Sequence, residues 1–187
     1  LFGHWWHEGP SWLEQVLRWM HDDYRLEAMT GREYLNDTPP STAVTLPEGS
    51  WGAGGGHYIW LNDDTAWSWR RIYQAERRMQ NLAERFEGTT DEQLQAFLHQ
   101  AARELLLLQA SDWQFLISTG GAPDYAAHRL VAHHSDFNRV ANLADRWARK
   151  EHLSDEDWAW FGDLCNRDRP FPDVKPEWFA KVDHWAE

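Results

Sequence analysis

From residue 63 to about residue 165 the sequence predicts a succession of amphipathic helices, and this pattern limits the possible fold more than any other feature. Apolar residues recur every three or four positions, and capping residues, proline or glycine bound most of the apolar stretches. Short connections between helices of this length favour an antiparallel helical bundle. The expected helices cover 63–87, 89–108, 109–119, 123–147 and 154–165. Thr89 with Glu92 forms a capping box for the second of them, and Ser154 with Asp157 begins the last one.

The first 48 residues have a different character. Pro10 suits the first position of a helix with one apolar face, and Thr30 with Glu33 forms a capping box for a second, shorter helix. A strand that leads into a helix indicates a β/α unit. The three segments expected to be extended are Leu1–Trp6, Arg25–Met29 and Ala43–Leu46.

Composition and charge exclude several classes of function. The formal net charge of the 187 residues is -12, which argues against binding to a nucleic-acid backbone or an anionic membrane. No apolar run approaches the length of a membrane span. Because Cys165 is the only cysteine, no internal disulfide is expected, and a cytoplasmic location is predicted. The chain opens without an initiator Met, in a dense aromatic run, and is therefore expected to be a piece of a longer polypeptide.

A glycine-rich loop at residues 49–63, GSWGAGGGHYIWLND, is the main candidate for a binding site. Trp51 and Trp60 flank four glycines, and His57 follows the last of them. Two indole rings beside a tightly folded backbone suit a flat, hydroxylated, weakly apolar ligand such as a sugar, because indole buries much area and still offers an N–H donor. The open alternative is an inert turn whose tryptophans belong to the core. A phosphate cradle is disfavoured, since no Lys-Ser/Thr follows the glycines.

The sequence offers weaker evidence for metal-binding residues or for further ligand-binding or catalytic carboxylates. No metal site and no cofactor are expected: His133 and His134 are adjacent and would point about 100° apart on a helix, and His4 and His7 lack further ligands. Asp112 either caps a helical turn or binds ligand hydroxyls beside Trp113. Glycoside chemistry needs a pair of carboxylates, and one of the two could be Glu8, Glu48 or Asp63. No sequence signal distinguishes these three residues from ordinary solvated surface charges.

Three long motifs together resemble one family. LFGHWWHEGPSWLEQVL, TLPEGSWGAGGGHYIWLND and ELLLLQASDWQFLISTGGAPDYAAHR are similar, in this order, to the C-terminal part of the 1,4-α-glucan branching enzymes of glycoside hydrolase family 57. The resemblance implies a mainly α fold in which residues 1–48 are the last strand and helix elements of an incomplete (β/α)7 barrel. Residues 49–187 would then be the helical C-terminal domain.

The resemblance also implies where the chemistry lies. The Glu nucleophile and the Asp acid/base of these retaining enzymes would precede Leu1, so no catalytic residue is expected in this chain, which alone would be inactive. Trp51, Trp60 and Asp112 match substrate-binding positions, and His57 lies beside them. The implied partners are an α-glucan and the rest of the barrel. GAGGGH replaces a more acidic loop, so no carboxylate role is expected there. The alternatives are a glucan-binding or structural module without its own reaction, and part of a family 57 amylase or glucanotransferase.

Overall fold

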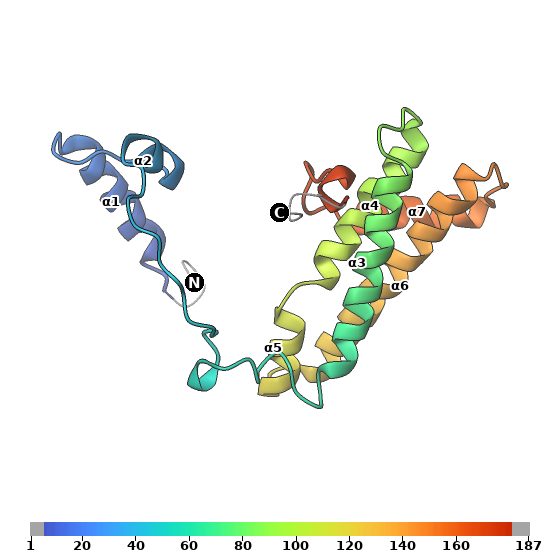
Figure 1. Cartoon of the computed structure of the whole chain (residues 1–187), viewed down its shortest axis with the longest axis horizontal. Coiled ribbons are helices and arrows are strands. Elements are labelled where there is room, and N and C mark those ends of the chain that lie inside the picture. The colour runs from blue at the N-terminus through green and yellow to red at the C-terminus, as the bar shows by residue number, and fades with distance from the viewer. Residues whose placement is uncertain (1–5, 181–187) are drawn as a thin grey trace. The chain divides into compact units, whose positions relative to one another are not determined.

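The computed structural model describes residues 6–180 and confirms the mainly α fold class, with helices as its regular elements (Figure 1). The chain divides into two compact units, Leu1–Glu48 and Gly49–Glu187. No helix among the described residues is long and apolar enough to cross a bilayer. The elements are α1 (Gly9–Asp22), α2 (Gly31–Asp37), η1 (Ala53–Gly55), α3 (Ala66–Arg85), α4 (Glu92–Leu108), α5 (Asp112–Thr119), α6 (Pro123–Ala148), α7 (Asp155–Arg167) and η2 (Pro176–Phe179).

The second unit is the predicted helical bundle. Helices α3, α4 and α6 lie side by side, and α4 runs antiparallel to both α3 and α6 (Figure 1). The short helix α5 packs on α6 at the end of the bundle where α3 begins. Their apolar faces close over a single core, as amphipathic helices with short connections require. The fully buried centre of this core includes Met79, Leu82, Phe97, Leu105, Leu108, Leu130, Phe137 and Leu143.

Several tryptophans belong to this core. Phe97 of α4 lies at the centre of an aromatic cluster, with its ring centroid 4.6 Å from that of Phe161 and 5.9 Å from that of Trp158. Trp147 packs edge-on against Trp158 at 5.7 Å. The indole N–H of Trp147 donates to the carboxylate of Asp91, so its one polar group is satisfied where it is partly buried. The chain has 14 tryptophans, and some of them therefore serve to pack the core.

Local signals place most helix ends correctly. Both Thr30/Glu33 and Ser154/Asp157 form complete capping boxes, and Pro123 stands in the first turn of α6. The predicted Thr89/Glu92 box is wrong. Asp91 caps α4 instead, and the Thr89 hydroxyl accepts a hydrogen bond from the Asp91 backbone.

Two further ends differ from the sequence prediction. Helix α3 begins at Ala66, after Thr65, whereas the sequence predicted a helix from residue 63. The segment after α4 does not continue as helix: the chain turns at residues 109–111 before α5, which ends at Gly120 in the left-handed conformation.

The first unit contains the two predicted helices but not the predicted strands. Apart from an isolated bridge at Trp6, none of its described residues is in a strand, so the expectations for Arg25–Met29 and Ala43–Leu46 are wrong; Leu1 to Trp5 lie outside the described residues. After α1, Asp23 accepts hydrogen bonds from the backbone and side chain of Arg25, which turns the chain. Extended segments without a neighbouring strand to pair with do not form a sheet.

Candidate functional site

The glycine-rich loop is folded onto Ser50. The Ser50 backbone N–H donates to the carbonyl of Gly55 at 2.8 Å, its hydroxyl donates to the carbonyl of Gly56 at 2.6 Å, and the same hydroxyl accepts from the N–H of Gly52 at 3.0 Å. Gly54 and Gly55 have φ values of 70° and 74°, which favour glycine over any residue with a Cβ atom. The loop is thus a tight bend with defined internal bonds.

Trp60 is fixed at the far end of this loop by bonds to the start of α3. Its carbonyl accepts from the Thr65 hydroxyl at 2.9 Å and from the indole N–H of Trp69 at 2.8 Å. The neighbouring carbonyl of Ile59 accepts from the hydroxyl of Ser118 in α5 at 2.5 Å. Because the contacts come from two helices of the bundle, the Trp60 backbone is held at a defined position relative to α3 and α5.

Trp51 lies against Trp60 and against α5. The ring centroids of Trp51 and Trp60 are 5.1 Å apart at an interplanar angle of 71°, and Phe115 lies 5.4 Å from Trp51 on α5. Trp51 is nevertheless 77% exposed. A large aromatic ring that is held in place and left accessible is the arrangement expected of a stacking platform, since little side-chain entropy remains to be lost on binding.

A cavity of about 570 Å³ opens beside the two tryptophans. This volume is in the range of about 300–1,000 Å³ that is common for small-molecule sites. All of its lining residues belong to the second unit. They are Ser50, Trp51, His57, Trp60, Leu61, Trp69, Tyr73 and Ser111.

Three of the four predicted site residues meet at this cavity, namely Trp51, Trp60 and His57. Asp112 does not line it: it is exposed in the first turn of α5, next to the lining residue Ser111. The sequence left open whether Asp112 caps a helical turn or binds a ligand beside Trp113, and Trp113 does not line the cavity either. The Trp113 indole donates to the carbonyl of Leu107 and its ring stacks on His133, so it faces inward.

The side of the cavity that α3 supplies could not be predicted from the sequence. It consists of Trp69 and Tyr73, whose i, i+4 spacing places them on one face of the helix. That signal existed, but aromatic residues at helical spacing are more often core. Only the folded position of α3 shows that these two face the glycine loop.

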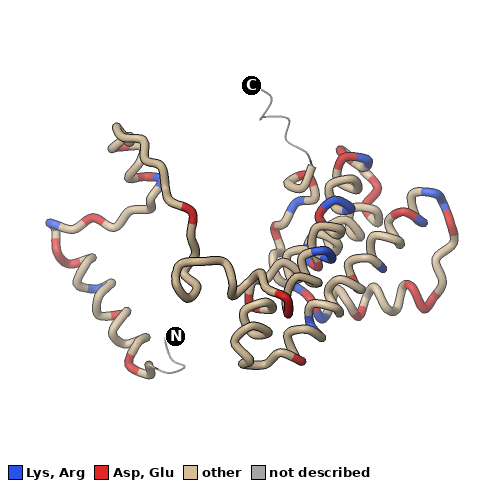
Figure 2. The backbone as a smooth tube through the Cα atoms, turned by 60° about the horizontal axis from the view of Figure 1, so that its bottom comes forward, with Lys and Arg blue, Asp and Glu red and all other residues tan. Residues whose placement is uncertain are grey.

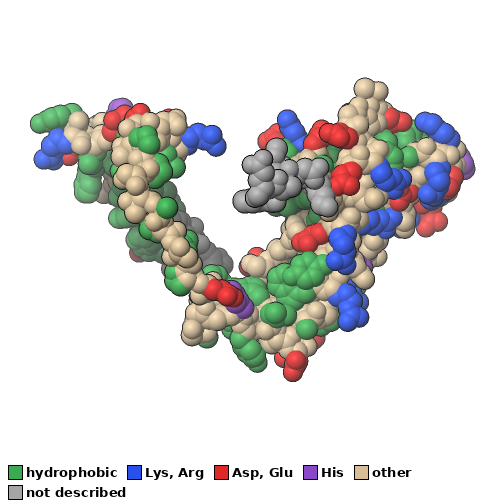
Figure 3. Space-filling view, in the orientation of Figure 1, with side chains coloured by type: hydrophobic (Ala, Val, Ile, Leu, Met, Phe, Trp, Pro, Cys, Tyr) green, Lys and Arg blue, Asp and Glu red, His purple; other side chains and the backbone are tan. Residues whose placement is uncertain are grey.

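The lining of the cavity is mostly aromatic and contains no Asp, Glu, Lys or Arg. Residues 49–62 contain no Asp, Glu, Lys or Arg, and Figure 2 shows this stretch of backbone as an uncharged section before the charge-rich helices. Hydrophobic side chains gather at the end of the unit where the loop, α5 and the start of α3 meet (Figure 3). Such a site suits a neutral ligand whose polar groups are hydroxyls.

A family model described as "1,4-alpha-glucan branching enzyme, C-terminal" matches residues 71–179. The chain belongs to this family. The resemblance inferred from the three sequence motifs is therefore confirmed.

Curated relatives agree with this family membership. The chain is 43% identical over 175 residues to the 1,4-alpha-glucan branching enzyme TK1436 of Thermococcus kodakarensis, an alignment that covers 93% of this chain and 25% of the relative. It is 29% identical over 177 residues to a probable 1,4-alpha-glucan branching enzyme of Mycobacterium tuberculosis, covering 82% of this chain and 32% of that protein. The chain thus spans about a quarter to a third of the relatives it matches.

Solved structures share the fold. The crystal structure of TK1436, a GH57 branching enzyme in complex with glucose and additives, matches with a TM-score of 0.74 at 40% identity, over 97% of this chain and 32% of that one. The GH57-type branching enzyme of Pyrococcus horikoshii gives 0.74 at 37% identity, over 97% and 33%. The alpha-amylase AmyC of Thermotoga maritima gives 0.60 at 26% identity, over 97% and 32%.

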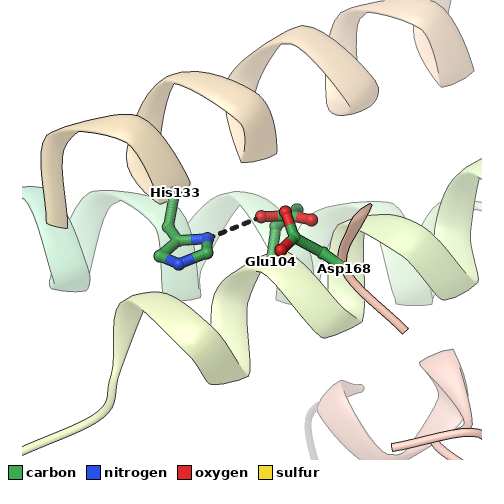
Figure 4. Close-up of side chains that lie close together, drawn as sticks. All are labelled: Glu104, His133 and Asp168. Carbon is green, nitrogen blue, oxygen red and sulfur yellow. Dashed lines mark hydrogen bonds and ion pairs between the residues drawn. The ribbon is translucent and has the colours of Figure 1, made fainter. Parts of the chain in front are cut away.

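The second unit also contains a buried polar cluster, remote in sequence from the glycine loop. Glu104 of α4, His133 of α6 and Asp168 after α7 converge, with one potential ligand atom of each within 4.8 Å of the others (Figure 4). His133 Nδ1 lies 2.9 Å from Glu104 Oε2. Burial raises the pKa of the Glu104 carboxyl above its ordinary value, while hydrogen bonds from His133 and Gln100 act in the opposite direction.

This cluster has the donor types of a metal site, but its atoms are engaged with one another and with arginines. Arg129 Nη2 can only donate, so at 2.8 Å it makes His133 Nε2 an acceptor and leaves the ring proton on Nδ1, facing Glu104. Asp168 accepts from Arg167 at 3.0 Å. A cation would have to displace these bonds and lie near two guanidinium groups. The arrangement therefore favours a structural hydrogen-bond network over a metal centre.

Proposed function

We propose that this chain binds an α-1,4-glucan as the C-terminal part of a retaining 1,4-α-glucan branching enzyme, in which residues 49–187 form the helical domain that contacts the substrate. The observation that supports this most directly is the cavity that joins Trp51, His57 and Trp60, in a chain that is 43% identical to a branching enzyme over 175 residues. A branching enzyme transfers a glucan segment to the 6-hydroxyl of another glucan chain, which creates an α-1,6 branch.

The chemistry of the cavity fits this role. Sugar rings have weakly apolar faces that stack on indole, and their hydroxyls need neutral donors and acceptors rather than counter-charges. His57 and Ser111 supply polar groups among the residues that line the cavity. A ring platform that holds the acceptor chain in place also helps to exclude water, which would otherwise hydrolyse the glycosyl intermediate. Asp112, beside Ser111, is proposed to contact glucan that extends beyond the cavity.

The reacting carboxylates are proposed to come from outside this chain. Retaining glycosyl transfer needs two carboxyl groups about 5 Å apart, one as nucleophile and one as acid/base. The family resemblance implies a Glu nucleophile on an earlier barrel strand and an Asp acid/base directly before the LFGHWW motif, and it assigns residues 1–48 to the end of that barrel. The role of the present chain is then binding and positioning, in a protein that we propose to be cytoplasmic.

Part of a glycoside hydrolase family 57 amylase is the second candidate, because the chain also matches the alpha-amylase AmyC. The comparison favours a branching enzyme, since identity to AmyC is 26% against 40% for TK1436. A longer polypeptide that carries this chain and its barrel, assayed for new α-1,6 linkages in amylose, distinguishes the two reactions. Hydrolysis without new branches would favour the amylase.

Calorimetric titration of the 187-residue chain with maltoheptaose tests glucan binding. We expect saturable binding that Trp51→Ala and Trp60→Ala each weaken by about tenfold, which corresponds to roughly 1.4 kcal/mol for the loss of one stacking ring. Calorimetry is preferable to fluorescence quenching, because 14 tryptophans dilute the signal of any one of them.

Trp178→Ala is the matched control. Trp178 is 64% exposed on η2 and does not line the cavity, so its loss should leave maltoheptaose affinity unchanged. Binding that is absent from a folded chain, or binding that the control weakens as much as Trp51→Ala does, contradicts the proposed site.

A further inference from the structure

We propose that Trp69 and Tyr73 of α3 form a second sugar-stacking position, so that the cavity holds several linked glucose units and its affinity depends on chain length. This inference rests on the proposed function. It assigns a role to the α3 side of the cavity, and it concerns which glucans bind rather than whether glucan binds.

Trp69 and Tyr73 are placed to act together. They lie one helical turn apart on α3, with ring centroids 5.8 Å apart at an interplanar angle of 34°. Both line the same cavity as Trp51 and Trp60. The cavity therefore has two pairs of aromatic rings, one on the glycine loop and one on a rigid helix.

A hydrogen bond connects the two pairs. The indole N–H of Trp69 donates to the carbonyl of Trp60 at 2.8 Å, which fixes the orientation of the Trp69 ring and ties it to the loop. Neither pair has to be assembled when a ligand arrives, so binding along both would cost little ordering entropy. This continuity is the reason to treat the rings as one extended surface rather than as two separate features.

Tyr73 has the properties of a contact residue. It is 50% exposed, and its hydroxyl makes no hydrogen bond within the part of the chain that the structure describes. A phenol can stack on a sugar ring and offers one donor and two acceptor positions to sugar hydroxyls. Trp69, by contrast, is half-buried and has already used its one donor, so we assign stacking area to Trp69 and both stacking and hydrogen bonding to Tyr73.

The second stacking position makes affinity depend on the length of the saccharide. A short saccharide that occupies only the Trp51–Trp60 pair gains nothing from α3, whereas a longer one contacts Tyr73 as well. The gain in affinity from maltose to maltoheptaose should therefore depend on Tyr73, while the affinity for maltose should not.

The test is calorimetric titration of the full 187-residue chain with maltose, maltotriose and maltoheptaose, for the wild type and for Tyr73→Ala and Tyr73→Phe. We expect Tyr73→Ala to weaken maltoheptaose binding by about fivefold, as loss of one aromatic contact would, and to leave maltose binding unchanged. Tyr73→Phe keeps the ring and should retain most of the gain with chain length.

Tyr125→Ala is the control for the loss of an exposed tyrosine. Tyr125 is 55% exposed on α6, packs edge-on against Trp113 and does not line the cavity, so its removal should affect no ligand.

The outcomes separate this proposal from the proposed function. If Trp51→Ala weakens all three ligands but Tyr73→Ala weakens none, glucan binding stands and the second position is overturned. If Tyr73→Ala weakens maltose and maltoheptaose equally, Tyr73 belongs to the first position and the dependence on length is wrong. If the folded wild-type chain binds none of the three, the proposed function itself fails.

Discussion

Glu104 is a buried side chain that makes the stability of the bundle depend on pH. It is fully buried on α4, accepts from His133 at 2.9 Å and from Gln100 at 2.9 Å, and its pKa is raised chiefly because burial penalises the charged form. Folding therefore raises its pKa above the unfolded value of about 4.5, and over that interval the native state binds more protons than the unfolded state. The contribution of Glu104 to stability is highest below the unfolded pKa and falls as pH rises through the folded pKa.

Replacing Glu104 tests this sign. Glu104→Gln removes the titration but leaves an amide N–H facing a donor, so at pH 5 we expect a lower free energy of unfolding by about 1–3 kcal/mol. The deficit should shrink as pH rises towards 8, because only the wild type then has to bury a carboxylate. Urea denaturation at several pH values measures it, with Glu87→Gln, on an exposed residue after α3, as control. Parallel pH profiles for wild type and Glu104→Gln would contradict the assignment.

The glycine loop is the element whose conformation the candidate site depends on most. A Cβ atom at Gly52 would lie 2.9 Å from Cζ3 of Trp60 and 3.1 Å from the Gly56 carbonyl, so the loop and the Trp60 ring could not both keep their places. At Gly56 a Cβ atom would meet nothing within 4 Å, and its φ of -91° is open to any residue. The two positions thus form a matched pair, four residues apart in one loop.

Gly52→Ala should accordingly weaken maltoheptaose binding by roughly tenfold, or about 1.4 kcal/mol, by moving the Trp60 ring away from Trp51. The melting temperature should stay close to that of the wild type, since the loop lies outside the core. Gly56→Ala should leave both quantities unchanged. Calorimetric titration and thermal unfolding measured by circular dichroism give the two readouts, and equal binding losses for the two variants would mean that Trp60 is not what Gly52 protects.

Over the full length of the chain, burial is divided unevenly between the two units. The apolar face expected on α1 is largely exposed, and among the described residues of the first unit only Gly9 is buried. The second unit contains the hydrophobic core. A segment with so little buried area has little free energy to resist local unfolding.

Limited proteolysis should therefore cut the chain first within residues 6–48. We expect a resistant product that begins near Gly49 and retains the helical bundle, identified by mass spectrometry of the fragments over time. Cleavage inside α3, α4 or α6 as early as cleavage in the first unit would show that the division of stability is wrong. A point variant of the core, Leu105→Ala, serves as a positive control, because a cavity at this fully buried position costs about 2–5 kcal/mol and should expose the bundle to the protease.

Much of the fold was predictable from local signals. The capping boxes at Thr30 and Ser154, the proline that opens α6 and the periodic apolar residues of α4 act over one or two helical turns, and the structure confirms each of them. The loop at 49–63 was also identifiable, because the glycines and the flanking tryptophans are neighbours along the chain. Local interactions of this kind depend on spacing alone and are largely insensitive to the rest of the molecule.

Side-chain positions that depend on packing between helices could not be predicted in this way. Trp113 was one candidate for a ligand contact and instead stacks on His133, while Trp69 and Tyr73, for which the sequence predicted no role, line the cavity. The carboxylates of Glu104 and Asp168 lie close together although the two residues are far apart in the sequence. Whether an aromatic ring is buried or left at a surface depends on which helix covers it, and only the three-dimensional arrangement of α3, α5 and α6 settles that.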